Sequence, residues 1–241
     1  MLLLCAWGAT RTDADVAVSQ TAYRQGKLLP VDVAKNDVGL RRLRRQLLGA
    51  AASRDVGRLL PLLGERVRGQ IGDEFEVSRG EFPREFARYS AADQLMFWQD
   101  LRDAVSLGFA RFTQQGEGMV CAPYVCGLLD SGFEEDGEPI LVVTANGVNV
   151  RADPNASSPV IETLHYDLVH RGSDIRYRGP HVDSRATKSG EFGGTHEWRR
   201  FKTPKGRLGW ILSKYVSDSG TVVFDFSKIG GDWKLTRFGP G

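Results

Sequence analysis

Cysteine and histidine are scarce in this sequence of 241 residues, which contains three and four of them, respectively. So few thiol and imidazole groups exclude a zinc module built on two cysteine pairs. The sequence also lacks a Gly-x-Ser-x-Gly elbow, a phosphate-binding loop, a dinucleotide-binding glycine pattern and a His-Glu-x-x-His motif. No stretch approaches the apolar length that a transmembrane span needs. We therefore expect no metal, no cofactor and no transmembrane span.

The overall composition is that of a folded protein, with 41% hydrophobic and 26% charged residues. The net charge of +2 gives no general argument for a nucleic-acid partner. The charge is unevenly distributed, because residues 170–217 contain eleven Lys and Arg against four Asp and Glu. Such a basic segment either faces an anionic partner or opposes the more acidic remainder of its own chain.

Residues 1–9 have an apolar core followed by small residues, as at the end of a secretion signal, although no basic residue precedes the core. We interpret them as a signal-peptide remnant, which predicts an exported, periplasmic protein. Cys5 follows Leu4, where a lipidation site has a small residue, so a lipoprotein is not expected.

A polar leader over residues 10–36 is followed by helical periodicity. Leucines at 40, 43, 47 and 48 predict a helix from Asp37, a second short helix is expected over residues 55–63, and Ser90 with Asp93 forms the capping signature of a third. Together with short strands near residues 110–112 and 119–125, these helices predict a helical α+β domain over residues 37–128. An acidic linker is expected over residues 129–139.

Residues 141–164 read LVVTANGVNVRADPNASSPVIETL, with a turn at Asn146-Gly147, and residues 206–216 read GRLGWILSKYV. Together these segments resemble the entry and exit of the bacterial SH3-like domain. The resemblance implies a small all-β barrel over residues 140–217 with a long basic loop. In such barrels the residues equivalent to Val150 and Trp210 fill the core. The segments SRGEF, FWQDLRDAVSLGF and CAPYVCG resemble a helical part found upstream of such modules in a family of uncharacterised proteobacterial proteins.

Residues 218–241 predict a β-hairpin that turns at Gly230-Gly231. The form KIGGDWKLTRF resembles the terminal hairpins of small α+β domains such as the cystatin-like cone, so we expect this hairpin to pack on the N-terminal domain. The predicted fold class is α+β: a helical α+β N-terminal domain, a small all-β SH3-like barrel and a C-terminal β-hairpin.

The chemistry-bearing residues do not form a recognisable catalytic set. Cys121 and Cys126 either form a disulfide, as an exported protein permits, or are two buried small hydrophobic residues. They lack the Asp-Cys-Ser-Gly context of wall-degrading thiol peptidases, and all four histidines lie in the SH3-like region. His165 and His170 are expected on opposite sides of one strand, where they cannot share a metal. The Asp-Ser-Gly triplets at 130–132 and 218–220 are explained as turns.

What remains is a binding surface in which aromatic rings lie beside Arg and Lys, an arrangement suited to sugars, peptides or carboxylates. The candidate ligand-binding residues are Tyr177, Arg178, Trp198, Arg199, Arg200 and Tyr215. For Tyr177 and Trp198 a place in the core is the open alternative.

The sequence therefore predicts a non-enzymatic exported protein that binds cell-wall peptide, peptidoglycan or another anionic envelope component. The alternative is a scaffold that binds an envelope protein in the periplasm. A hydrolase with an unrecognised site ranks third, and nucleic acid is not an expected partner because of the predicted export.

Overall fold

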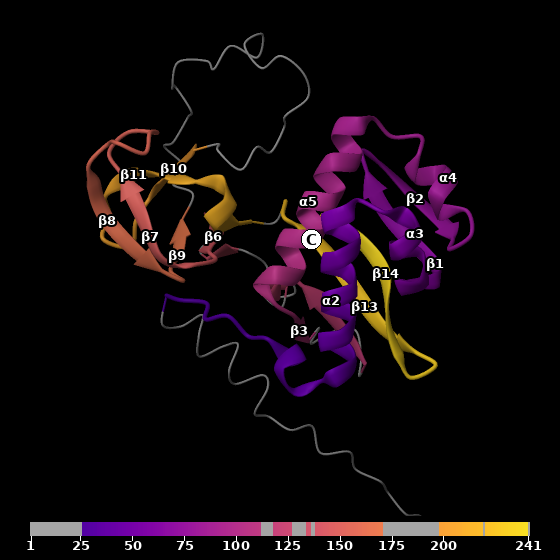
Figure 1. Ribbon diagram of the computed structural model, residues 1–241. Coiled ribbons are helices and arrows are strands. Elements are labelled where there is room, and N and C mark those ends of the chain that lie inside the picture. The colour runs from indigo at the N-terminus through magenta and orange to yellow at the C-terminus, as the bar shows by residue number, and fades with distance from the viewer. Residues whose placement is uncertain are drawn as a thin grey trace, which may run out of the picture.

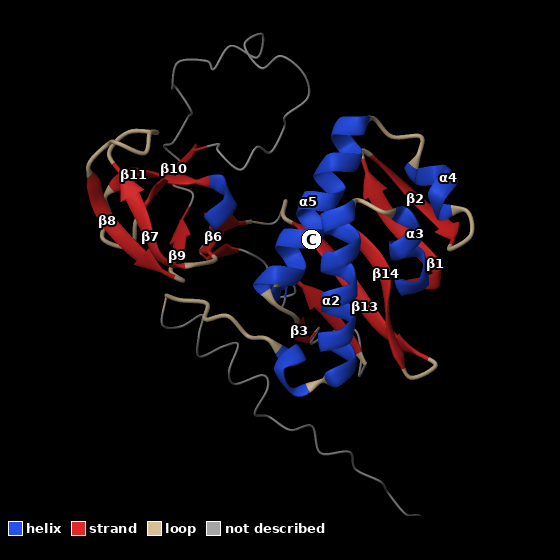
Figure 2. Cartoon of the chain, viewed as in Figure 1, coloured by secondary structure: helices blue, strands red, loops and turns tan. Residues whose placement is uncertain are grey.

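Two β-sheets organise the described part of the chain, and helices cover the six-stranded one (Figures 1 and 2). The computed structural model describes residues 26–111, 118–126, 134–135, 138–170, 198–218 and 220–240. The predicted signal-peptide remnant over residues 1–9 and most of the predicted basic loop lie outside these ranges. The architecture is mixed α+β, as the sequence predicts. Within the described ranges, no helix is both long enough and apolar enough to cross a membrane.

The larger lobe combines most of the helices with the first and the last strands of the chain. Its elements are η1 (Val33–Asn36), α2 (Val38–Ser53), α3 (Val56–Leu59), η2 (Leu60–Leu62), β1 (Leu63–Ile71), β2 (Asp73–Ser78), α4 (Phe82–Phe86), α5 (Ala91–Leu107), β3 (Ala110–Arg111), β4 (Met119–Ala122), β13 (Val222–Ile229) and β14 (Asp232–Pro240). The strand order is β2-β1-β14-β13-β4-β3. The β13–β14 hairpin therefore lies at the centre of this sheet, with β14 parallel to β1.

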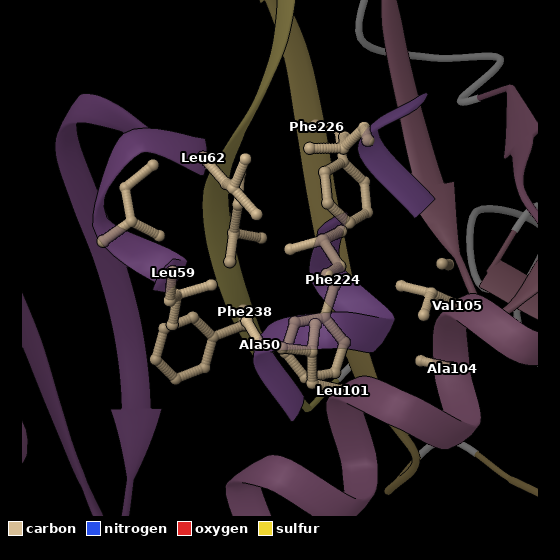
Figure 3. Close-up of a cluster of buried hydrophobic side chains, with 14 of the residues drawn as sticks. Ala50, Leu59, Leu62, Leu101, Ala104, Val105, Phe224, Phe226 and Phe238 are labelled. Carbon is tan, nitrogen blue, oxygen red and sulfur yellow. The ribbon is translucent and has the colours of Figure 1, made fainter. Parts of the chain in front are cut away.

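An aromatic core joins that hairpin to the helices (Figure 3). Phe224 and Phe226 of β13 are fully buried, and the ring of Phe238 in β14 lies 5.0 Å from that of Phe97 in α5, edge to face. Edge-to-face rings add to the free energy gained by burying apolar area. The C-terminal strands thus supply much of the core of the N-terminal helices.

Local signals in the sequence account for the two long helices. Asp37 caps α2 by accepting the Leu40 N–H at 3.0 Å, and Ser90 caps α5 by accepting the Asp93 N–H at 3.2 Å. The helix expected over residues 55–63 is present and ends early, an end that Pro61 in the sequence leaves open. It consists of the short α3 and the 3₁₀ turn η2, and β1 begins at Leu63. Pro61 has no N–H to donate, which favours this early end.

The smaller lobe is a sheet built from the middle of the chain. Its elements are β5 (Glu134–Glu135), β6 (Glu138–Val143), β7 (Asn146–Arg151), β8 (Val160–His165), β9 (Leu168–His170), β10 (Trp198–Lys202), β11 (Leu208–Leu212), η4 (Ser213–Tyr215) and β12 (Val216–Ser217). The order is β12-β6-β9-β10-β11-β7-β8, and β5 pairs with β6. Over the described residues this ladder stays open between β12 and β8. Part of the expected acidic linker, residues 134–135 and 138–139, is strand.

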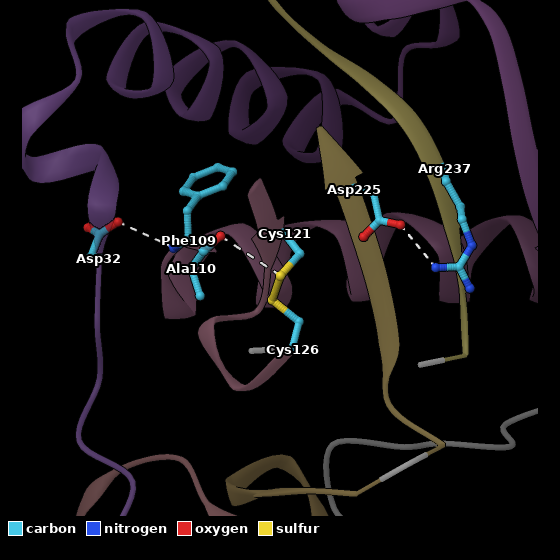
Figure 4. The surroundings of a disulfide bond; sticks show 7 residues. All are labelled: Asp32, Phe109, Ala110, Cys121, Cys126, Asp225 and Arg237. Atoms are coloured by element: carbon cyan, nitrogen blue, oxygen red, sulfur yellow. Dashed lines mark hydrogen bonds and ion pairs between the residues drawn. A yellow bond between two sulfur atoms is a disulfide. The ribbon is translucent and has the colours of Figure 1, made fainter. Parts of the chain in front are cut away.

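A hydrophobic cluster fills the junction between the two lobes. It combines residues from six stretches of the chain, namely Leu28, Ala110, Cys121, Tyr124, Val125, Cys126, Ile140, Val142, Leu168 and Val223. Cys121 and Cys126 form a disulfide within it, and both are fully buried (Figure 4). Of the two possibilities that the sequence leaves open, the structure has the bonded pair.

The end of the predicted leader also ties the lobes together. The Lys27 ammonium lies 2.9 Å from the Asp167 carboxylate, and the Leu28 N–H donates to the Tyr166 carbonyl at 2.8 Å. The Tyr124 hydroxyl donates to the Leu28 carbonyl at 3.3 Å. The first two contacts fasten Lys27 and Leu28 to the turn between β8 and β9, and the third fastens Leu28 to the disulfide segment.

We predict that reducing the Cys121–Cys126 disulfide lowers the free energy of unfolding by about 2 kcal/mol, the entropic value for so short a loop. Urea titrations of the protein with and without dithiothreitol measure this difference. The Cys121→Ala/Cys126→Ala variant should match the reduced protein and should not respond to dithiothreitol. Unchanged midpoints in the wild type would contradict the prediction.

A second prediction concerns Asp37, whose other carboxylate oxygen accepts the Trp233 indole N–H at 3.0 Å. Asp37→Ala should cost about 2 kcal/mol, because it removes a cap and leaves a buried indole N–H unsatisfied. The control Asp55→Ala removes the cap of α3, which the Asp55 carboxylate provides by accepting the Arg58 N–H, and an exposed ion pair with the Arg58 guanidinium at 3.6 Å. It leaves no buried donor unsatisfied and should cost about 1 kcal/mol or less.

The Asp37 contribution should also depend on pH. Burial acts to raise the pKa of this carboxyl, but hydrogen bonds from Leu40 and Trp233 hold the pKa below its usual value. A lowered pKa in the folded state means that the stabilisation is present above the unfolded-state pKa of about 3.9 and is lost as the pH falls below it. The difference between wild type and Asp37→Ala should therefore shrink between pH 6 and pH 3.

Candidate functional site

The two sides of the sheet in the smaller lobe have different surroundings. The inner side packs around a cluster of its own, which consists of Leu141, Val143, Val148, Val150, Leu164, Val169, Phe201 and Ile211. On the outer side, Ile140 and Val142 of β6 and Leu168 of β9 join the junction cluster. The outer side of β7, β8, β10 and β11 is not part of either cluster, and we call it the outer face.

A β-bulge decides which side chains reach the outer face. Val150 pairs with Glu162, whereas Arg151 pairs with Val160, so Ile161 is an extra residue in β8. Val150 points inward and is fully buried, whereas Val160 is 46% exposed. Because successive side chains alternate along a strand, Arg151 lies on the outer face.

Gly209 brings β11 close to this bulge. A Cβ at Gly209 would lie 2.3 Å from Val150 Cγ1 and 2.8 Å from Ile161 Cδ1, far inside ordinary contact distance. The glycine thus lets the backbone of β11 lie against the inward side chains. The next residue, Trp210, consequently points to the outer face.

Trp210 forms a row with two arginines across three strands. It pairs with Arg151 of β7 on one side and with Arg200 of β10 on the other. The Arg200 guanidinium carbon lies 5.9 Å from the centre of the Trp210 ring, within the range of a cation–π contact. Trp210 is only partly buried. The expectation that it fills the core is therefore wrong, whereas that for Val150 is confirmed.

Beside this row the surface has a hollow of about 250 Å³. Trp198, Leu212 and Tyr215 contribute aromatic and apolar walls to the hollow. Asn146 and Asn149 contribute amide groups, and Arg151 contributes a guanidinium group. We call it the outer hollow. It draws on β7, β10, β11 and η4, so strand pairing brings its walls together from distant parts of the sequence.

Contacts around the hollow hold its polar walls in place. Arg151 donates from Nη1 to the Ser158 carbonyl at 2.6 Å, and the Ser158 hydroxyl in turn accepts the Asp153 N–H at 2.9 Å. On the rim, the Gly147 N–H donates to His165 Nδ1 at 3.2 Å, and Asn146 Oδ1 lies 2.5 Å from the same nitrogen. The arginine and the turn at 146–147 are thus positioned by the protein itself.

The residues predicted from the sequence are only partly brought together. Trp198 and Tyr215 line the hollow, and Arg200 lies in the neighbouring row. Arg199 alternates to the other side of β10 and forms an ion pair with Asp218 at 2.6 Å. Tyr177 and Arg178 lie outside the described residues. The sequence does not point to the two asparagines, and for Arg151 it leaves ligand binding and structural support of the loop equally open.

The structure corrects the expectation for the two histidines. His165 ends β8 and His170 ends β9, with the left-handed Tyr166 between them, so they do not share a strand. Asp218 belongs to a turn, as expected, since its carboxylate accepts the Gly220 N–H at 3.0 Å. In the described part of the chain, no three His, Cys, Asp or Glu side chains are grouped to hold a metal ion.

Comparisons with known proteins add little. No family model matches the chain, and no curated protein matches it. A solved structure named Rd1NTF2_05, which carries five further substitutions, is 11% identical, with coverage of 86% of this chain and 99% of that one. Its TM-score of 0.28 is too low to support an argument about fold.

The close approach at Gly209 generates a prediction. Gly209→Ala should destabilise the protein by about 1–3 kcal/mol, because the added methyl group overpacks the contact with Val150 and Ile161. Gly49→Ala is the matched control. An added methyl group there meets nothing within 4 Å, and alanine favours a helix over glycine, so this change should be neutral or stabilising. Equal urea midpoints for the two variants would contradict the packing described here.

Proposed function

We propose that the chain is a non-enzymatic exported protein whose smaller lobe is an SH3-like module that binds cell-wall peptide in the outer hollow. The observation that carries the proposal is the combination of aromatic walls, Trp198 and Tyr215, with the oriented Arg151 guanidinium. Support for the SH3-like assignment comes from the two motif segments. Although they are 59 positions apart in the sequence, Arg151 of the first segment and Trp210 of the second pair directly.

The chemistry of the hollow suits a peptide with a free carboxylate. A guanidinium donates two parallel hydrogen bonds to a carboxylate, and the side-chain amides of Asn146 and Asn149 can pair with peptide groups. Trp198, Tyr215 and Leu212 provide contact for small aliphatic side chains. At about 250 Å³ the hollow is smaller than a typical site for a drug-sized ligand, so only part of a peptide would enter it.

The disulfide supports the exported location in this proposal. Disulfides persist in oxidising compartments such as the bacterial periplasm and are rare in the cytosol. Cys121 and Cys126 are fully buried within the junction cluster, where their bond stabilises the packing of the two lobes.

Co-sedimentation with isolated peptidoglycan sacculi tests the proposal. The wild type should pellet with sacculi at low and at moderate salt. Trp198→Ala and Arg151→Gln should each weaken binding by about ten-fold or more, as expected for central contacts of an interface. The matched controls are Leu208→Ala, an exposed apolar residue at the far end of β11, and Arg66→Gln, an exposed arginine of β1.

Both controls should pellet as the wild type does. If the wild type stayed in the supernatant at both salt concentrations, cell-wall binding would be wrong. Leu208→Ala is the control for Trp198→Ala, and Arg66→Gln is the control for Arg151→Gln. If each control lost as much binding as its matched variant, the outer hollow would not be the site.

A further inference from the structure

The described part of the outer face carries positive charge and no acidic side chain. Arg151 points outward from β7, and Arg200 and Lys202 point outward from β10, with β11 between the two strands. The outward positions of β7, β8, β10 and β11, as far as the structure describes these strands, hold no Asp or Glu. The nearest acid in the strands, Glu162, is turned inward, and its side chain is only 5% exposed.

The two arginines flank Trp210 in a fixed geometry. Each of the three residues lies directly opposite the next across the sheet. Since neighbouring strands lie about 4.8 Å apart, the backbones of Arg151 and Arg200 are separated by about 10 Å. At about one Debye length, two exposed like charges repel each other only weakly, and an anion between or above them is attracted to both.

Among the residues that the structure describes, neither guanidinium group is paired with an acid. Arg151 is held by the Ser158 carbonyl, and Arg200 lies over the Trp210 ring. Neither contact uses all five N–H donors of a guanidinium, so each arginine keeps donors for a ligand. An arginine that is already positioned loses less conformational entropy when it binds a carboxylate.

We infer that the ligand of the outer face carries two carboxylates about 10 Å apart, one bound by Arg151 in the hollow and the other by Arg200 above Trp210. This inference rests on the proposed function, because it assigns the ligand class of the same site. The partner is therefore a diacidic peptide, and a ligand with one carboxylate uses only half of the row.

Calorimetric titration of the full chain with three blocked tripeptides tests the inference. The peptides are Glu-Ala-Glu, Gln-Ala-Glu and Gln-Ala-Gln. In an extended peptide, residues two apart point to the same side with their backbones about 7 Å apart, and the long glutamate side chains span the remaining distance. The diacid should bind at least about five-fold more tightly than the monoacid, the gain expected from one further charge-assisted contact at a surface.

Variants of β10 locate the second contact. Arg200→Gln should abolish the preference for the diacid and leave the affinity for the monoacid within about two-fold of wild type. Lys202→Gln removes the same charge from the same face of the same strand, two residues away, and should keep the preference. Equal loss in both variants would show general attraction to a basic surface and would overturn the inference.

The outcomes separate this inference from the proposed function. Diacid preference without pelleting on sacculi would support the arginine row and overturn the cell wall as the partner. In the converse outcome, the protein would pellet with sacculi in a way that depends on Trp198, but it would bind the diacid and the monoacid equally well or bind neither. This outcome would overturn the two-carboxylate inference and leave cell-wall binding in place.

Discussion

The hydrophobic cluster at the junction of the two sheets is the interaction on which the rest of the structure depends. It joins the end of the leader, the disulfide segment, β6, β9 and β13 in one buried group. Because β13 also lies at the centre of the six-stranded sheet of the larger lobe, the packing of the C-terminal hairpin and the placement of the smaller lobe are coupled. Removing apolar area from water drives this association, and the Cys121–Cys126 bond restricts the unfolded chain.

The same cluster determines which surface of the smaller lobe is available to a ligand. The outer side of β6 and β9 is buried against the larger lobe, so β7, β8, β10 and β11 present the remaining side. On that side the bulge at Ile161 turns Arg151 outward, and the glycine at 209 brings Trp210 beside it. The binding groups are thus carried by paired strands, which hold them more precisely than loops do.

Features that depend on neighbouring residues could be predicted from the sequence. The cap at Ser90, the helix that begins after Asp37 and the turn at Gly230-Gly231 follow from local hydrogen bonding, periodicity and backbone freedom. The orientation of Trp210 could not be predicted, because it depends on a bulge in β8, about 50 residues away. The pairing of Arg199 with Asp218 similarly depends on side-chain alternation in a strand whose register the sequence does not specify.

The central claim, that the outer face is the binding surface, can be tested directly through the tryptophan indole N–H resonances of the isotope-labelled full chain. Trp198 and Trp210 lie on the outer face, whereas Trp98 and Trp233 are buried in the larger lobe. During titration with soluble fragments of digested peptidoglycan, we expect the Trp198 and Trp210 signals to shift with ligand concentration and those of Trp98 and Trp233 to stay in place. Shifts at Trp233 with none at Trp198 or Trp210 would contradict the account.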